Sequence, residues 1–237
     1  MMKTPFDCLI FDADHTLLDY KADERGAFLR LFSSLSLTLD ERQIERLHFL
    51  SEHTWSQAGL SDVASEYTQR NYHDLYRSHL RILFPRIFEE LGVSADAGIA
   101  SERFLKELEH TGNPIKGAEE TLALLQKNYR LFVATNGLSA IQRGRLAVFG
   151  KRFEKLFISE EMGVIKPQKE FFDRILEEIG AKKETCLMIG DSLSSDIAGA
   201  KQSGLAAWWY NPTQQTNGSP FLPDRQIQDL KTLTELL

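Results

Sequence analysis

Five short runs of apolar residues stand apart from the more polar stretches of the chain. They are Cys8–Phe11, Leu131–Ala134, Leu156–Ile158, Cys186–Ile189 and Ala206–Tyr210. Continuous apolar runs of this length are typical of strands that are buried on both faces, as in a parallel sheet covered by helices. The pattern therefore predicts five buried strands in the order given.

Segments with helical periodicity separate the last four of these runs. One begins after Gly137, a second follows Pro167, and a third ends at Gly204, where a left-handed glycine is expected to cap the helix. The alternation of strands and helices predicts a doubly wound, Rossmann-like α/β core with a parallel sheet. After the fifth strand we expect a surface loop over 211–223 and a final short helix over 226–237.

The stretch from Leu17 to Gly112 breaks this rhythm because it is nearly all helical in pattern. Asp40 followed by Gln43 predicts a capped helix start. One face of a later amphipathic helix would carry Tyr72, Leu75, Tyr76, His79, Leu80 and Leu83. So long a helical block exceeds an ordinary crossover connection. We therefore expect a helical cap domain over 17–112, inserted into an α/β core made of 1–16 and 113–237.

The composition is that of an ordinary globular protein. The chain has 237 residues, of which 42% are hydrophobic and 26% charged, which fits one domain carrying an insertion. Its net charge of −6 lacks the basic excess that binding to duplex nucleic acid requires. No apolar run is long enough to span a membrane, and Met1–Asp7 does not resemble the start of a signal peptide. We expect a cytoplasmic monomer or homodimer.

Only two cysteines occur, Cys8 and Cys186, and each lies within an apolar run. This position predicts buried thiols in a reducing compartment and argues against a disulfide framework or a zinc site.

Polar residues follow the predicted strands where ligands bind in an open parallel sheet, outside the carboxyl ends of the strands. They are Asp12 and Asp14 after the first strand, Thr135, Asn136 and Gly137 after the second, Lys166 beyond the third, and Asp191 with Asp196 after the fourth. Four strands would thus place several carboxylates, one lysine and one hydroxyl on a single rim.

The chemistry of this set is that of magnesium-assisted phosphoryl transfer. Clustered carboxylates repel one another unless a cation lies among them, and hard oxygen ligands suit Mg²⁺ better than Zn²⁺. Asp12 and Asp14 are two positions apart, so both can face one pocket, where one attacks while the other moves protons. The expected phosphate ligands are Thr135, Lys166 and the backbone N–H groups of Asn136 and Gly137.

These residues resemble the four motifs of the haloacid dehalogenase superfamily of phosphohydrolases. The motifs occur in order as Asp12-x-Asp14-x-Thr16, Thr135, Lys166-Pro167 and Gly190-Asp191-x(4)-Asp196, and the helical insertion resembles that superfamily's cap. Within the superfamily, the chain is most similar to the pyrimidine 5′-nucleotidase branch. That similarity is carried by Phe11–Asp19, Thr135–Gly137 with Gln142, Arg145 and Leu146, Ser159–Glu161 with Gly163, and Trp209–Pro212.

The resemblance implies a role for each core residue. Asp12 would be the nucleophile that forms an aspartyl-phosphate, and Asp14 would protonate the leaving group and then activate water. Mg²⁺ would be held by Asp12, the backbone carbonyl of Asp14 and Asp191, with Asp196 acting behind them or through water. The implied catalytic set is Asp12, Asp14, Thr135 and Lys166. The implied substrate is a small phosphomonoester, with uridine- and thymidine-type nucleotides favoured.

Other functions remain open at this stage. A sugar-phosphate phosphatase or mutase is compatible with the core, because the cap selects the leaving group. Hydrolysis of a carbon–halogen bond would need neither metal nor proton donor, so the second acid, Asp14, favours phosphate. A phospho-acceptor signalling module would share the acids and the lysine but would lack the inserted helical block.

Two features of the sequence bear on specificity. His15 stands where the branch often has Asp, and it would be either a pH-sensitive contact near the cap hinge or an exposed turn residue. In the cap, the candidates for contact with a base or sugar are Trp55 and Arg70 first, then His53, Tyr72, His73 and Tyr76.

Overall fold

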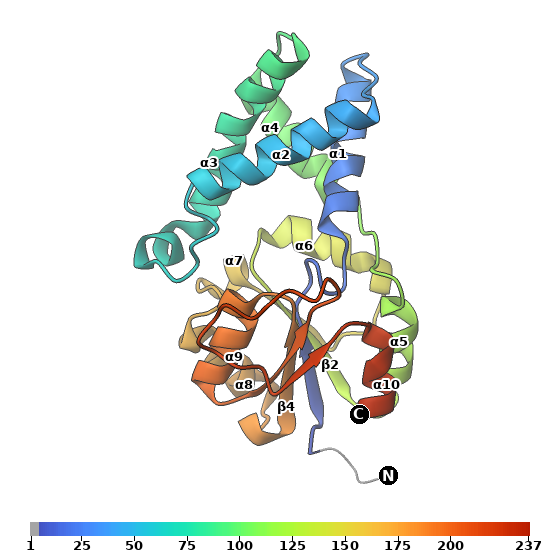
Figure 1. Ribbon diagram of the computed structural model, residues 1–237, viewed down its shortest axis with the longest axis vertical. Helices are drawn as coiled ribbons and strands as arrows, with labels where there is room; N and C mark the ends of the chain where they lie inside the picture. Colours follow the sequence, from blue (N-terminus) through green and yellow to red (C-terminus); the bar gives the residue numbers. More distant parts are fainter. Residues whose placement is uncertain (1–4) are drawn as a thin grey trace.

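The computed structural model describes residues 5–237. Residues 1–4, which begin the predicted core segment 1–16, lie outside this range. The centre of the structure is a six-stranded sheet in the order β3-β2-β1-β4-β5-β6, in which every pairing is parallel (Figure 1). The strands are β1 (Cys8–Phe11), β2 (Arg130–Thr135), β3 (Lys155–Ile158), β4 (Cys186–Gly190), β5 (Ala206–Tyr210) and β6 (Arg225–Ile227). The predicted doubly wound α/β fold with a helical insertion is confirmed, as are its five strands.

The sixth strand and the end of the chain differ from the prediction. Arg225–Ile227 pairs with β5, whereas we expected a helix from residue 226 onward. The helical part is shorter and consists of a 3₁₀ turn at Leu230–Thr232 followed by α10 (Leu233–Leu236). Because β6 is a three-residue edge strand with two polar side chains, it has no apolar run, and only its backbone pairing reveals it.

Alternate residues of the strands face opposite sides of the sheet, and each side has its own hydrophobic core. Leu9 and Phe11 of β1 pack with α5 (Ala118–Leu125), whereas Cys8 and Ile10 pack with α8 (Lys169–Ile179). The second face also receives α9 (Ala198–Ser203), whose C-cap Gly204 has a φ of 80°, as predicted. Both cysteines are buried free thiols, as expected.

Helices between β1 and β2 form a separate layer at one end of the molecule, beyond the carboxyl ends of the strands (Figure 1). They are α1 (Tyr20–Ser34), α2 (Glu41–Gln57), α3 (Glu66–Leu91) and α4 (Ala97–Glu109), and they share one hydrophobic core. Asp40 and Gln43 form the predicted capping box of α2. Leu138 and Ile141, at the start of α6 (Ser139–Leu146), join the same core and link this layer to the sheet.

The fifth helix between β1 and β2, α5, packs on the sheet and not with this layer. No helix among residues 5–237 combines the length and apolar character needed to cross a membrane.

Candidate active site

The strand ends meet at a cavity of about 610 Å³ between the sheet and the helical layer. From the sheet side it is lined by Asp12, Asp14, His15, Thr135, Asn136, Lys166, Asp191, Ser192, Ser194 and Ser195. The topology explains the gathering, since the order of the strands reverses between β1 and β4 and a crevice opens at such a point.

Lys166 joins two of the carboxylates at the floor of this cavity. Its Nζ donates to Oδ1 of Asp12 at 2.5 Å, to Oδ1 of Asp196 at 2.7 Å and to the carbonyl of Ala134 at 2.7 Å. Although burial opposes the charge, Asp12 and Asp196 raise the pKa of Lys166, so it is held as an ammonium. Burial and the Asp196 carboxylate raise the pKa of Asp12 well above its ordinary value, and Lys166 only partly offsets them.

Asp191 completes a cluster of three carboxylates, with Asp12 and Asp196, that offers one oxygen each within 4.8 Å of one another. Burial and Asp196 raise the pKa of Asp191 to about 6, although the hydroxyl of Thr16 donates to its Oδ1 at 3.1 Å. A divalent cation would relieve this repulsion, and oxygen-only ligands are those that Mg²⁺ prefers. The donor set therefore fits magnesium.

Asp196 is held in place by the turn that follows β4. Its Oδ2 accepts a hydrogen bond from the backbone N–H of Ser192 at 3.0 Å, while its Oδ1 accepts one from Lys166. A side chain at Gly190 would place its Cβ 2.2 Å from the same Oδ2, so only glycine fits there. With both oxygens engaged, Asp196 braces Lys166 and the turn.

Asn136 and Thr135, at the end of β2, are also fixed by hydrogen bonds. The Asn136 side chain bonds both backbone groups of Lys166, accepting from its N–H at 2.8 Å and donating to its carbonyl at 2.9 Å. The Thr135 hydroxyl accepts from Gln142 at 2.6 Å. The N–H of Gly137, which we expected to bind phosphate, instead donates to the Ser159 hydroxyl at 3.0 Å, and Gly137 does not line the cavity.

Asp14 lies at the mouth of a buried ion-pair network. Its Oδ1 pairs with Arg145 at 2.5 Å and its Oδ2 accepts from Gln142 at 2.9 Å. Arg145 is wholly buried and also pairs with Asp23 of α1 at 2.7 Å. Asp23 in turn accepts from the backbone N–H groups of Gly112 and Asn113, at 2.9 Å each. The network thus ties Asp14 to both chain segments that lead into the helical layer.

The six cap candidates fall into different surroundings. Trp55, Tyr72 and Tyr76 line the cavity. Arg70 does not line it, and its side chain is 77% exposed and paired with Glu66 on the surface, so we drop the substrate contact expected for this residue. His53 is also outside the cavity and stacks on Phe49, and His73 bonds the hydroxyl of Ser159 at 2.8 Å. Helical periodicity could not separate these cases because it does not tell which face of a helix meets the sheet.

His15 is exposed, has a φ of 61° and lines the cavity. It is therefore an exposed turn residue, the second of the two alternatives, while a pH-sensitive contact near the cap hinge stays a prediction.

Sequence reasoning missed several polar residues of the cap that border the cavity, three of which are buried, Glu24, His48 and Ser51. They lie on the buried faces of α1 and α2. Polar residues at otherwise apolar helix positions were the only signal that could have found them.

Comparison with known proteins places the chain among characterised relatives. It is 32% identical over 233 residues to the pyrimidine 5′-nucleotidase PynA of Streptococcus pneumoniae, covering 97% of this chain and 94% of that protein. It is 29% identical over 235 residues to the pyrimidine 5′-nucleotidase YjjG of Escherichia coli, covering 98% of each.

A solved structure agrees with the fold over the whole chain. The crystal structure of the HAD-hydrolase YfnB from Bacillus subtilis, bound to magnesium, matches with a TM-score of 0.83 and 29% identity, covering 99% of each chain. The family model for the haloacid dehalogenase-like hydrolases matches residues 6–204. With its acidic cluster at the carboxyl ends of the parallel strands, the chain belongs to the haloacid dehalogenase-like hydrolases.

Proposed function

We propose that the protein is a magnesium-dependent phosphomonoester hydrolase that acts on pyrimidine nucleoside 5′-monophosphates. The observation that carries the reaction type is the pair of carboxylates on one loop, Asp12 beside Lys166 and Asp14 at the same cavity. The names of PynA and YjjG support the substrate class. The division into a core of 1–16 and 113–237 and a cap of 17–112 remains part of this proposal.

The residues of the cavity suit a two-step displacement. An oxygen of Asp12 attacks phosphorus to form an aspartyl-phosphate while Asp14 gives its proton to the departing sugar oxygen. Asp14 then takes a proton from water, whose oxygen attacks phosphorus, so that phosphate leaves and Asp12 is regenerated. Lys166 and Thr135 would hold the phosphoryl oxygens during both steps.

The acidic cluster would hold Mg²⁺ through Asp12, the carbonyl of Asp14 and Asp191, with Asp196 bracing them through Lys166 and Ser192. Bound there, the cation would neutralise charge that develops on the phosphoryl oxygens. Because these core residues contact only phosphate and metal, discrimination among leaving groups must come from the cap side of the cavity, where Trp55 remains a proposed contact.

The test is a comparison of kcat/KM for dUMP, dTMP, UMP, AMP, GMP and a hexose phosphate, with Mg²⁺ and with a chelator. We expect the three pyrimidine nucleotides to lead and the chelator to abolish turnover. Asp12→Asn, which keeps the shape but removes the nucleophile, should be inactive on every substrate. A tenfold advantage for the purines or the hexose phosphate would refute the pyrimidine assignment, while an active Asp12→Asn would refute the mechanism.

A further inference from the structure

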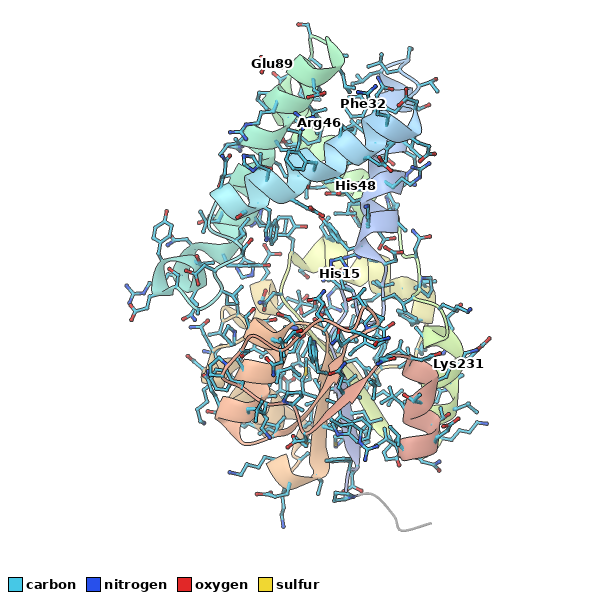
Figure 2. All side chains as sticks on the ribbon, viewed as in Figure 1. His15, Phe32, Arg46, His48, Glu89 and Lys231 are labelled. Carbon is cyan, nitrogen blue, oxygen red and sulfur yellow. The ribbon has the colours of Figure 1, made fainter. Side chains whose placement is uncertain are left out.

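A cluster of buried polar side chains lies on the cap side of the cavity. Glu24 of α1 is 4% exposed and His48 of α2 is 5% exposed, and both line the cavity with Ser51. The Ser51 hydroxyl donates to Oε1 of Glu24 at 2.6 Å, and Oε2 of Glu24 contacts Nδ1 of His48. Both carboxylate oxygens are therefore in use. Figure 2 shows His48 in the helical layer and His15 at the edge of the sheet domain that faces it.

The other ring nitrogen of His48, Nε2, has no hydrogen-bonding partner among residues 5–237. Nε2 is not among the fully buried polar atoms, so it is accessible from the cavity that the ring lines, where a ligand can supply a hydrogen-bonding partner. The ring borders the same cavity as Asp12 and Lys166, which a ligand anchored by its phosphate would extend across. Nε2 is thus an unpartnered polar atom that the cap presents to the same cavity.

The cap also lines the cavity with aromatic residues that suit a flat ring, alongside the polar residues Lys21, Glu52 and Ser61. Tyr72 and Tyr76 are at most 7% exposed, and Trp55 meets both edge-on, with centroids 6.2 Å and 5.2 Å away. Burial raises the pKa of Tyr76 to about 12, so its hydroxyl stays neutral. Aromatic walls beside an unpartnered ring nitrogen suit a planar heterocycle with a polar edge.

We propose that His48, held by Glu24, recognises the base of the substrate by accepting a hydrogen bond from the N3–H of a uracil or thymine ring. The Glu24 carboxylate accepts a hydrogen bond from Nδ1–H, and in that tautomer of the imidazole the lone pair on Nε2 is an acceptor. Uracil and thymine present N–H at position 3, whereas cytosine presents a second lone pair there. This inference rests on the proposed nucleotidase activity and adds to it the residue that selects among pyrimidines.

The test compares variants on substrates that differ in one hydrogen-bonding group. The substrates are UMP, N3-methyl-UMP, CMP and para-nitrophenyl phosphate, which has no base. We expect the wild-type enzyme to favour UMP over CMP and N3-methyl-UMP by about tenfold to a hundredfold in kcat/KM. His48→Ala should remove most of this preference by raising KM for UMP, and should change para-nitrophenyl phosphate turnover by less than about twofold.

Two further variants separate recognition from loss of structure. His53→Ala alters a histidine on the same helix that is exposed and outside the cavity, and it should keep the wild-type preference. His48→Gln offers an oxygen acceptor in place of Nε2 and should restore part of the preference for UMP. His48→Ala and the N3-methyl group remove the same hydrogen bond, the first by deleting the acceptor and the second by deleting the donor. Their effects on kcat/KM should therefore not add.

The outcomes distinguish this inference from the proposed function. If the wild-type enzyme hydrolyses para-nitrophenyl phosphate but no nucleotide, the proposed function fails and the role of His48 fails with it. If it hydrolyses UMP and His48→Ala keeps the full preference over N3-methyl-UMP, only the role of His48 is refuted. Additive effects of the variant and the methyl group would refute it as well.

Discussion

Replacing Arg145 with Met should destabilise the protein far more than the same change at its neighbour Arg143. Arg145 is wholly buried and pairs with Asp14 and with Asp23, whose side chain is also fully buried. Although burial opposes its charge, these two carboxylates raise the pKa of Arg145, so the guanidinium is permanently charged. Met fills a similar volume but leaves the Asp23 carboxylate without its cation.

The size of the effect follows from what remains around Asp23. Removing one partner of a buried ion pair typically costs about 3–5 kcal/mol. Three N–H groups, from Gly112 and Asn113, still donate to Oδ1 of Asp23, so we expect the lower end, about 3 kcal/mol. For a chain of this size about 2–4 °C of melting temperature corresponds to 1 kcal/mol, which gives a decrease of about 6–12 °C.

The assay is urea unfolding of the two single variants alongside the wild type, with melting temperatures measured by circular dichroism. Arg143 pairs with Glu161 on the surface at 2.7 Å and is 53% exposed, so Arg143→Met should cost less than about 1 kcal/mol. Asp23→Asn combined with Arg145→Met should cost less than the sum of the two single changes. A loss at Arg145 no greater than that at Arg143 would refute the reasoning.

Two further predictions concern the acids of the site. Asp14→Asn should slow hydrolysis of UMP by ~10²–10⁴-fold. It should slow phosphoryl transfer from para-nitrophenyl phosphate much less, because the phenolate leaves without a proton. Equal slowing of both substrates would show that Asp14 has only a structural role. Burial and Asp196 raise the pKa of Asp191 from 3.8 to about 6. Between these two pH values the folded metal-free protein holds a proton on Asp191 that the unfolded chain has lost. The contribution of Asp191 to the free energy of unfolding therefore falls as the pH rises through this range. Added Mg²⁺ should therefore raise the melting temperature more at about pH 7.5 than at about pH 5, and an equal rise at both would contradict this. Asp191→Asn should reduce the difference without removing it, because the pKa of Asp12 is raised as well.

Local sequence alone was sufficient for the five buried strands and the acidic rim. Each buried strand is visible in the sequence as a continuous apolar run, as at Cys8–Phe11. The residues that follow each run lie at the edge of the sheet where that strand ends. Because parallel strands end at one edge, Asp12, Asp191 and Lys166 had to meet there, and the structure brings them together. The short edge strand β6 could not be predicted in this way, because it pairs with β5 through backbone groups and its sequence contains no apolar run.

Tertiary structure alone decided which polar residues of the cap face the cavity. Arg70 and Tyr72 are two residues apart on α3, yet one is in solvent and the other lines the cavity. The contacts between Glu24 and His48, and between Asp23 and Arg145, join segments that are distant in the sequence. A helix pattern shows which positions share a face, but the partner of that face depends on how whole helices pack, and no local rule contains that information.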